Sequence, residues 1–503
     1  MRINIGEVLT KRSFLTPERE GLVCEKVRRT YRELNDRANR LANAMKALGV
    51  GHGDRVGILA LNEPEYYDLY FGLGKIGAIL VPVNYRLAGP EIQFILSDCE
   101  AKVFVFGKEY KDIVDSIRKD ITARDLIAIS DEPIEWAKSY ESLISSASDK
   151  EPEIVGGDDD TLTILYTSGT TGRPKGAELT HNYYFWNSVN ILSTLGIDVG
   201  NNTLIALPLF HIGALAIPPY LVHAGGKAIL LRSLDPQRFL ELLQEEKITG
   251  FGSVPALLDI LKWVPNFEKY DWSSVRNILV YAAPVPVTLI KEYAAAGIQV
   301  RQLYGLTEGN TATVLDPENA LTKVGSCGKP FFHTEVRVVD DEGKDVGPDI
   351  NGEILLRMPN MMKGYWNRPK DTAATIKDGW LYTGDIGKMD AEGFFYILDR
   401  KKDMIISGGE NIYPAEIEDY LLNHPKIADV GVIGYAHEKW GEAVKAIVVL
   451  KPGETLTEAE LIEWCQGKIG RFKIPKSVVF TNAIPRTPTG KILKTVLREQ
   501  YNV

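Results

Sequence analysis

Residues 162–176 read LTILYTSGTTGRPKG, an apolar run followed by a loop rich in glycine and hydroxyl side chains. Glycines let a backbone approach an anion and turn its N–H groups inward, while hydroxyl and ammonium groups add donors and charge. The stretch therefore predicts a strand that ends in a phosphate-binding loop. Its candidate ligands are Thr167, Ser168, Gly169, Thr170, Thr171, Gly172 and Lys175.

The spacing of these glycines separates the loop from two better known phosphate-binding motifs. Only two residues lie between Gly169 and Gly172, whereas a Walker A loop has four residues between its glycines and ends in GK[ST]. Two other glycine-rich segments, 51–57 (GHGDRVG) and 407–411 (SGGEN), also miss the dinucleotide-binding pattern.

Apolar strands and helices alternate on both sides of this loop. Residues 55–61 (RVGILAL), 78–83 (AILVPV) and 102–107 (KVFVFG) are typical of strands, and residues 66–77 between the first two are typical of a helix. Parallel strands need such crossover helices and are buried on both faces. The rhythm resumes after Gly157, so the pattern predicts an α/β fold with parallel βαβ sheets.

Two further strands frame a second ligand-binding region. Residues 277–281 (NILVY) and 300–304 (VRQLY) are predicted as strands around a helix near 286–296, which Gly297 ends. In open α/β sheets, the loops at the carboxyl ends of strands form the ligand crevice. We therefore expect a site in the turns that follow these two strands.

The pattern changes after about residue 399. A helix at 415–422, strands at 429–433 and 446–450, and a second helix with a capping box of Thr457 and Glu460 predict a smaller α+β unit. The charged segment 399–404 (DRKKDM) lies between the two units and predicts a linker. We expect a large domain over residues 1–399, a hinge over 400–403 and a small domain over 404–503.

Composition places limits on the class of protein. A chain of 503 residues exceeds one hydrophobic core, and about three packed units are expected. The net charge of −9 argues against a nucleic-acid partner, because phosphate backbones require clustered basic residues. The N-terminus lacks an apolar signal segment, which predicts a cytoplasmic location and leaves peripheral membrane contact open. Free thiols in a reducing compartment are expected for Cys24, Cys99, Cys327 and Cys465.

Three more motifs follow the loop along the chain: QLYGLTEG at 302–309, YTGD at 382–385 with ILDRKKD at 397–403, and IPRTPTGKILK at 484–494. In this order the four motifs resemble the adenylate-forming superfamily of acyl-CoA synthetases, peptide-synthetase adenylation domains and luciferases. The resemblance extends from residue 166 to residue 491. It implies a large domain that binds ATP and the acyl substrate, and a small mobile domain that carries a catalytic lysine.

The resemblance assigns a role to each motif residue. Lys491 would reach the α-phosphate and the substrate carboxylate, where a fixed cation offsets the repulsion of two anions. Glu308, together with Thr167, would hold Mg2+ on the triphosphate, since hard cations favour oxygen ligands and share them with phosphates. Thr307 would contact phosphate or carboxylate. The other implied nucleotide contacts are Tyr304 near adenine, Asp385 and Arg400 at the ribose, and Ala283, Gln302 and Gly305.

The second half-reaction and the acyl pocket are assigned in the same way. His211 in PLFHIGAL would gate the acyl pocket. The small residues Gly213, Ala214 and Ala216 near it leave room for an alkyl tunnel or, equally, for a flat aryl pocket. Lys402 would be the hinge residue. The implied coenzyme A contacts are Gly408, Gly409 and Glu410, with Trp440 and Phe472 at its nucleotide end or, alternatively, packed in the core.

The resemblance implies an acid–thiol ligase that uses ATP, Mg2+ and coenzyme A and holds no tightly bound organic cofactor. A carboxylic acid and ATP would give acyl-AMP and pyrophosphate, and the thiol of coenzyme A would displace AMP. We favour fatty acids of medium to long chain over aryl or other acids. An adenylating enzyme with another acceptor and a non-catalytic binding protein remain alternatives, although Lys491, Glu308 and Asp385 are all retained. A monomer or a homodimer is expected.

Overall fold

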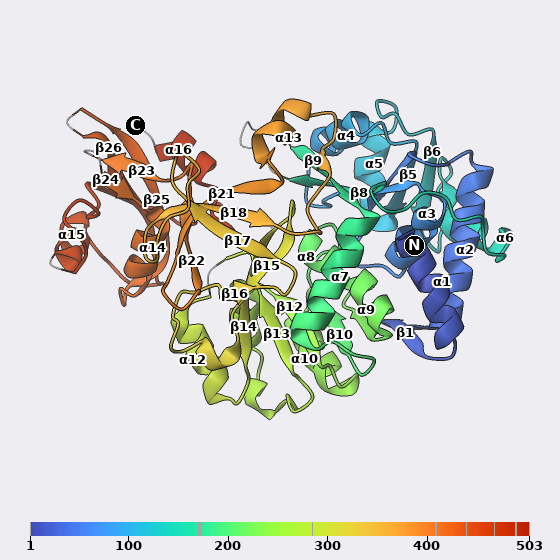
Figure 1. The fold of residues 1–503 in the computed structure, drawn as a ribbon, viewed down its shortest axis with the longest axis horizontal. Helices are drawn as coiled ribbons and strands as arrows, with labels where there is room; N and C mark the ends of the chain where they lie inside the picture. Colours follow the sequence, from blue (N-terminus) through green and yellow to red (C-terminus); the bar gives the residue numbers. More distant parts are fainter. Residues whose placement is uncertain are drawn as a thin grey trace.

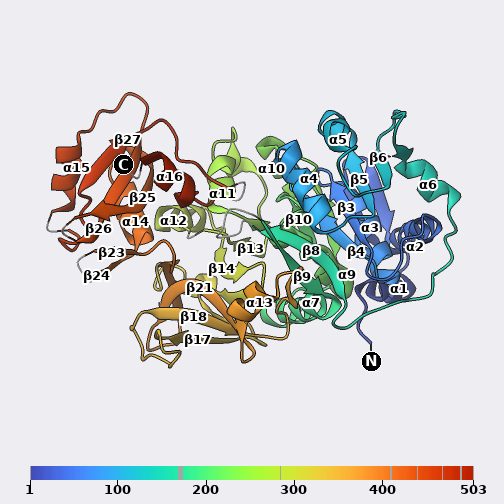
Figure 2. The same ribbon diagram turned by 90° about the horizontal axis from the view of Figure 1, so that it is seen from above.

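The computed structural model describes residues 2–501 apart from 168–173, 284, 408–409, 439, 467 and 488–489, and describes residues 410–411 by their backbone alone. Within these residues the strands form four sheets. Figures 1 and 2 show the first helices at one end of an elongated molecule and the last residues of the chain at the other. The first three site motifs come from elements between these two ends, and the fourth belongs to the C-terminal unit.

The first sheet contains the strand that precedes the phosphate-binding loop. Its eight strands lie in the order β19 (Gly364–Tyr365), β9 (Lys175–Thr180), β8 (Thr161–Thr167), β4 (Ile79–Pro82), β3 (Arg55–Leu59), β5 (Val103–Gly107), β6 (Asp125–Ile129) and β7 (Lys138–Ser139). The predicted βαβ units are confirmed, because β3 pairs in parallel with both β4 and β5. Directly after Gly157 the loop joins two antiparallel strands, because β8 and β9 form a hairpin. The expected parallel rhythm then resumes in the second sheet.

The second sheet carries the other ligand-binding turns. Its nine strands lie in the order β16 (Lys329–Pro330), β15 (Asn310–Val314), β14 (Val300–Leu306), β13 (Asn277–Val280), β12 (Gly250–Ser253), β10 (Asn202–Ile205), β11 (Lys227–Leu230), β1 (Glu20–Cys24) and β2 (Val27–Thr30). The predicted strands β13 and β14 pair in parallel around helix α12 (Val287–Ala295). β14, β15 and β16 then pair antiparallel at one edge.

Helices bury both faces of the two sheets. One apolar cluster joins strands of both sheets to α1 (Ile5–Leu15), α2 (Tyr31–Ala47), α3 (Glu65–Lys75), α7 (His181–Leu195) and α9 (Ile217–Ala224). The outer face of the first sheet is covered by α4 (Gly89–Asp98) and α5 (Lys111–Ile117). The outer face of the second is covered by α10 (Pro236–Glu245), α11 (Pro255–Leu261) and α12. This layering is the two-sided burial expected for parallel strands.

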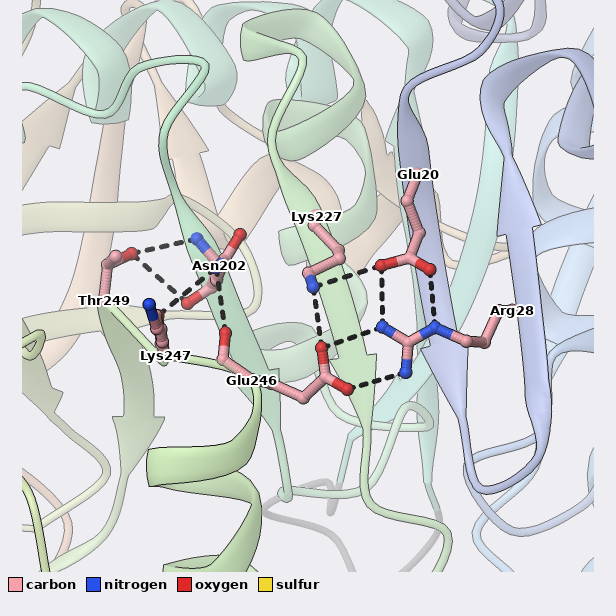
Figure 3. Close-up of polar contacts among 7 residues, drawn as sticks. All are labelled: Glu20, Arg28, Asn202, Lys227, Glu246, Lys247 and Thr249. Carbon is pink, nitrogen blue, oxygen red and sulfur yellow. Dashed lines mark hydrogen bonds and ion pairs between the residues drawn. The ribbon is translucent and has the colours of Figure 1, made fainter.

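An ion cluster fixes the edge hairpin of β1 and β2 to the second sheet (Figure 3). Arg28 contacts Glu20 at 2.6 Å and Glu246 at 2.7 Å, and Lys227 contacts the same two carboxylates at 3.1 and 2.7 Å. The hydrogen bond from Arg28 lowers the pKa of Glu246 to about 2. A network with shared partners stabilises more than an isolated surface pair does. It therefore anchors the N-terminal hairpin on the sheet that carries β13 and β14.

A third sheet links the two parts of the chain and was not predicted. Its strands are β17 (Glu335–Val339), β18 (Gly352–Arg357), β21 (Trp380–Met389) and β20 (Ile376–Lys377), with β22 (Phe395–Arg400) paired to β21. All of these pairs are antiparallel. The predicted linker at 399–404 is therefore too long, since Asp399 and Arg400 belong to β22 and only the residues after them form a turn.

The fourth sheet belongs to the small C-terminal unit. It orders β24 (Glu410–Ile412), β23 (Ile405–Ser407), β26 (Gly441–Leu450) and β25 (Ile427–His437), with β27 (Ser477–Phe480) parallel to β26. Helices α14 (Pro414–Leu422), α15 (Glu458–Cys465) and α16 (Lys494–Tyr501) complete the unit, and the capping box of Thr457 and Glu460 is confirmed. None of the helices that the structure describes is long and apolar enough to cross a membrane. All four cysteines are free and buried, as expected.

Candidate active site

The ends of β8 and β9 position the phosphate-binding loop. Thr167 and Lys175 are register partners at the loop end of the hairpin, and the Thr167 hydroxyl donates to the Lys175 carbonyl at 3.4 Å. The other predicted loop ligands lie outside the residues that the structure describes: Ser168, Gly169, Thr170, Thr171 and Gly172. The hairpin thus fixes both ends of the predicted loop.

A short chain of contacts joins this hairpin to the turn that carries Glu308. The Lys175 ammonium lies 2.8 Å from an Asp371 carboxylate oxygen and 5.5 Å from the centre of the Tyr365 ring. The Tyr365 hydroxyl in turn donates to Glu308 Oε1 at 2.7 Å. Strand β19 pairs Tyr365 with Ala177 of β9. Tyr365, which belongs to neither motif, therefore contacts both Lys175 of the first motif and Glu308 of the second.

The turn after β14 is shaped by a position where only glycine fits. A Cβ on Gly305 would lie 1.8 Å from the Asn310 carbonyl oxygen, far inside van der Waals contact. Register shifts at this point, between Tyr304 and Gly305, before the strand continues antiparallel to β15. The Thr307 carbonyl accepts from the buried Tyr183 hydroxyl at 2.8 Å. These contacts hold Thr307 and Glu308 at the carboxyl end of β14, where a ligand was predicted.

Two other predicted nucleotide contacts sit beside this turn. The Gln302 side-chain oxygen accepts from the Val285 N–H at 3.2 Å, which ties β14 to the turn after β13. Ala283 lies in that turn and is half-buried. Its neighbour Ala282 has φ of 74°, an unusual conformation for a residue with a side chain. Such conformations cluster at ligand sites, which agrees with the predicted role of this turn.

Asp385 forms the most tightly partnered group in the site. Its carboxylate accepts from the Tyr304 hydroxyl at 2.6 Å through Oδ2 and contacts Arg400 Nε at 2.6 Å through Oδ1. Asp385 and Arg400 are register partners on β21 and β22. Burial and the nearby Asp385 charge raise the pKa of Tyr304 well above its usual value, so Tyr304 stays a donor. Three predicted nucleotide contacts from two motifs are thus brought together.

Lys491 approaches this cluster from the C-terminal unit. Its side chain is exposed, yet partial desolvation by surrounding protein groups and the positive charge of Arg400 lower its pKa, while the carboxylates of Asp385 and Glu308 oppose the shift. The Lys491 N–H donates to Thr487 Oγ1 at 3.1 Å, and the Thr487 N–H donates to the Lys491 carbonyl at 2.7 Å. This turn presents one ammonium group to residues of the large domain.

His211 faces the same region from the start of α8 (Ile212–Leu215). Burial lowers the pKa of His211 to about 4, and the positive charges of Arg86 and Lys491 add to the shift. Its Nε2 is buried without a hydrogen-bond partner among the described residues. A neutral imidazole with a free ring nitrogen is therefore placed within electrostatic reach of Lys491.

The expected room beside Gly213 is filled. The Tyr281 hydroxyl donates to the Gly213 carbonyl at 2.8 Å, and a Cβ on Gly213 would lie 2.5 Å from the Tyr281 ring. Ala214 and Ala216 are buried. The small residue at 213 thus accommodates the Tyr281 ring, and the shape of the acyl pocket stays a prediction.

The predicted coenzyme A contacts lie in the C-terminal unit. Gly408 and Gly409 fall outside the described residues, as does the Glu410 side chain. Ser407, the residue just before Gly408, pairs with Gly441 and so lies close to Trp440. The Trp440 ring stacks on His437 and carries the Lys476 ammonium at 5.6 Å. Phe472 is 39% exposed, so the alternative that it packs in the core is wrong.

The donor set fits a cation that arrives with phosphates. Among the residues that the structure describes, no three carboxylate, histidine or cysteine side chains gather to hold a metal alone. Glu308 offers a carboxylate beside the phosphate-binding hairpin, and Thr167 offers a hydroxyl at its base. Mg2+ typically takes one or two protein carboxylates and completes its shell with phosphates and water.

Sequence reasoning missed Tyr365, Asp371 and Tyr183. Tyr365 stands in a Gly-Tyr-Trp segment and Asp371 lies in the first turn of α13 (Pro369–Thr375), neither of which resembles a catalytic motif. Tyr183 lies on α7, inside an aromatic run typical of a core helix. Only the pairing of β9 with β19 and the packing of α7 under the 302–309 turn bring these side chains to the site.

Comparisons with known proteins agree with this geometry. Residues 9–366 match the model of the AMP-binding enzyme family, and residues 416–491 match the AMP-binding enzyme C-terminal domain. The chain is 42% identical to the long-chain-fatty-acid–CoA ligase FadD13 of Mycobacterium tuberculosis and 38% identical to a feruloyl-CoA synthase of Amycolatopsis, with 99% of both chains covered in each case. The ATP-bound structure of MatB from Rhodopseudomonas palustris superposes with a TM-score of 0.92 at 31% identity, covering 100% of this chain and 99% of that one.

Proposed function

Because the chain belongs to the AMP-binding family of adenylate-forming enzymes, as an acyl-CoA ligase that uses ATP, Mg2+ and coenzyme A, we propose that its substrate is a fatty acid and that the motif residues act as follows. The observation that carries the proposal is that the charges of Asp385, Arg400 and Glu308, all in the large unit, act on the ammonium group of Lys491 in the small unit. Two adjacent anions, a carboxylate and a triphosphate, need such a cation between them.

In the first half-reaction, the substrate carboxylate attacks the α-phosphorus of ATP and pyrophosphate leaves. Lys491 offsets the repulsion of the two anions and the charge that builds on the phosphoryl oxygens. Asp385 accepts from the ribose hydroxyls, since a carboxylate has lone pairs beyond those that Tyr304 and Arg400 occupy. Glu308 and Thr167 would hold Mg2+, which neutralises charge on the phosphates.

In the second half-reaction, the thiolate of coenzyme A attacks the acyl carbon and AMP leaves. The proposed coenzyme A residues, from Gly408 to Glu410 with Trp440 and Phe472, belong to the C-terminal unit. A rotation of that unit about Lys402 would replace Lys491 at the site with this second group of residues. Lys402 itself is exposed and lies just after the end of β22.

Fatty acids are favoured over aryl acids by the comparisons, because the fatty-acid ligase FadD13 is more similar to this chain than the feruloyl-CoA synthase, 42% against 38% identity. The neutral His211 and its buried apolar neighbours suit an apolar acyl group of either kind. The four cysteines of the chain are free thiols. Because disulfides form mainly in oxidising compartments, we infer a reducing cytoplasmic site of action.

The test is coenzyme A thioester formation by the purified chain with ATP and Mg2+. The acids are a series of straight-chain fatty acids, with benzoate, cinnamate and ferulate as competitors at equal concentration. We expect the highest kcat/KM for a fatty acid of medium to long chain. A higher kcat/KM for an aryl acid would contradict the substrate assignment, and acyl-AMP release without thioester would contradict coenzyme A as the acceptor.

A further inference from the structure

The chain before Lys402 is bound to the large unit. The Lys401 N–H donates to the Gly384 carbonyl at 2.8 Å, and the Lys401 ammonium lies 3.0 Å from Asp341 and 3.2 Å from Glu353. All three partners lie on or beside the third sheet. Residue 401 is therefore fixed to the strands that carry Asp385.

The chain after Lys402 is bound to the small unit. Asp403 contacts Arg498 of α16 at 2.9 Å. Helix α16 is itself packed on β25, where Leu497 is fully buried beside Gly431. Anchors on both sides leave Lys402 as the residue about which the small unit can turn. The N–H groups of Asp403 and Met404 close a turn on the Arg400 carbonyl, which such a rotation would open.

The backbone of Asp399 belongs to the large unit, but its side chain bonds to the small unit. It pairs with Ile386 in the third sheet, which sets its backbone. Its Oδ2 accepts from the Ala415 N–H of α14 at 2.9 Å and lies 3.5 Å from the Lys494 ammonium of α16. The α14 N-cap residue, Tyr413, supplies no side-chain cap, so Asp399 satisfies one of that helix's free N–H groups.

The contact with Lys494 is buried and has a second acidic partner. The side chains of Asp399 and Lys494 are only 6% and 9% exposed, and Glu418 lies 3.2 Å from the same ammonium. Glu418 belongs to α14, so it moves with Lys494. After a rotation about Lys402, Lys494 keeps one carboxylate and only the contact with Asp399 is lost. The pair can therefore open without leaving Lys494 buried and unpaired.

We propose that Asp399 is a positioning residue for adenylation, which holds Lys491 at the reacting atoms by bonding to Ala415 and Lys494 and releases them before thioester formation. This rests on the proposed function, in which one site serves two half-reactions. Lys494 follows Lys491 by three residues and opens α16, so its position sets that of the Lys491 turn. Asp399 stabilises one orientation of the small unit and contributes nothing to the other.

The test measures the two half-reactions separately in the full chain, using whichever acid turns over best. For Asp399→Ala we expect acyl-AMP formation to slow roughly tenfold, the worth of a hydrogen bond to a charged group. Thioester formation from supplied acyl-AMP and coenzyme A should stay within about twofold of wild type, as expected for a change outside that site. A loss confined to one half-reaction is a result that a purely structural role would not give.

Three further variants complete the design. Asp399→Asn keeps an acceptor for the Ala415 N–H and should lose less adenylation than Asp399→Ala; Lys494→Met tests the ion pair from the other side if the alanine variant is poorly folded. Lys426→Met is the control, because its ammonium bonds to the Thr455 carbonyl inside the small unit. Equal losses in both half-reactions, or no loss in either, would overturn the proposal. A wild-type chain that forms no acyl-AMP would instead overturn the proposed function.

Discussion

Lys491 is the single residue on which the proposed adenylation chemistry depends most. Its ammonium group must be protonated to stabilise the phosphoryl oxygens, and its surroundings lower its pKa from the usual value. The protonated fraction therefore falls as pH rises through this lowered pKa, earlier than for a solvated lysine. In the free enzyme, this loss of protonated Lys491 lowers kcat/KM for ATP.

We predict that kcat/KM for adenylation in the wild type declines on the alkaline side and that Lys491→Arg removes this decline. Arginine keeps its charge at every accessible pH, although its shape lowers the absolute rate. Pyrophosphate exchange followed from neutral to alkaline pH checks the prediction. An alkaline limb shared by wild type and Lys491→Arg would show that another group titrates.

His181 controls stability rather than chemistry. It is fully buried, its Nδ1 accepts from the Ile5 N–H at 3.0 Å, and burial lowers its pKa to about 4, against the opposing charges of Asp158 and Asp160. In the unfolded chain its pKa is about 6.5. Between these values the unfolded state binds more protons, so stability falls as pH falls, by about 3 kcal/mol over the whole interval.

We predict that acidification from pH 7.5 to pH 4.5 lowers the thermal unfolding midpoint by several degrees more in wild type than in His181→Gln. Glutamine supplies an acceptor for the Ile5 N–H but does not titrate. Parallel midpoints for the two proteins across this range would contradict the account of His181.

At the scale of elements, the turn between β14 and β15 places Thr307 and Glu308. Gly305 is the position that permits it, because any Cβ would overlap the Asn310 carbonyl. We predict that Gly305→Ala slows adenylation by roughly tenfold or more, since relief of the overlap must displace the turn at a cost of about 1–3 kcal/mol. Gly347→Ala is the control, as that glycine faces open space. An unchanged adenylation rate in Gly305→Ala would contradict the role of the turn.

The elements predicted from sequence are those with strong, local signals. The parallel strands β3, β4, β5, β13 and β14 are short apolar runs bounded by helices, and α12 ends at Gly297 as its pattern requires. The antiparallel third sheet was missed because its strands, such as β17 and β21, are only partly buried and mix charged with apolar residues. Asp399 and Arg400 were placed in a linker for the same reason: a charged run hides the end of β22.

The residues of the candidate site likewise fall into those that a local motif predicted and those that no local signal revealed. Lys491, Glu308, Asp385 and Arg400 were found because each stands in a distinctive motif. Tyr365 and Asp399 were given no role, because their importance comes from strand pairing and from contacts between units that are far apart in sequence. The ring packed against Gly213 was not foreseen, because it belongs to Tyr281, nearly seventy positions away along the chain.

At the scale of the whole molecule, the proposed site draws on both units. The large unit would supply Asp385, Arg400, Glu308 and His211, and the small unit would supply Lys491. The proposed coenzyme A residues also belong to the small unit. This division of residues is what an enzyme with two successive half-reactions requires, provided that the acyl group passes through an adenylate.

The adenylate route is tested most directly with a fatty acid whose carboxylate carries 18O. If a carboxylate oxygen attacks the α-phosphorus and the thiol then breaks the bond between that oxygen and the acyl carbon, one labelled oxygen must leave in AMP. We predict AMP with a single 18O for each thioester formed, measured by mass spectrometry of the released nucleotide. Label in inorganic phosphate, with ADP as the nucleotide product, would contradict the account.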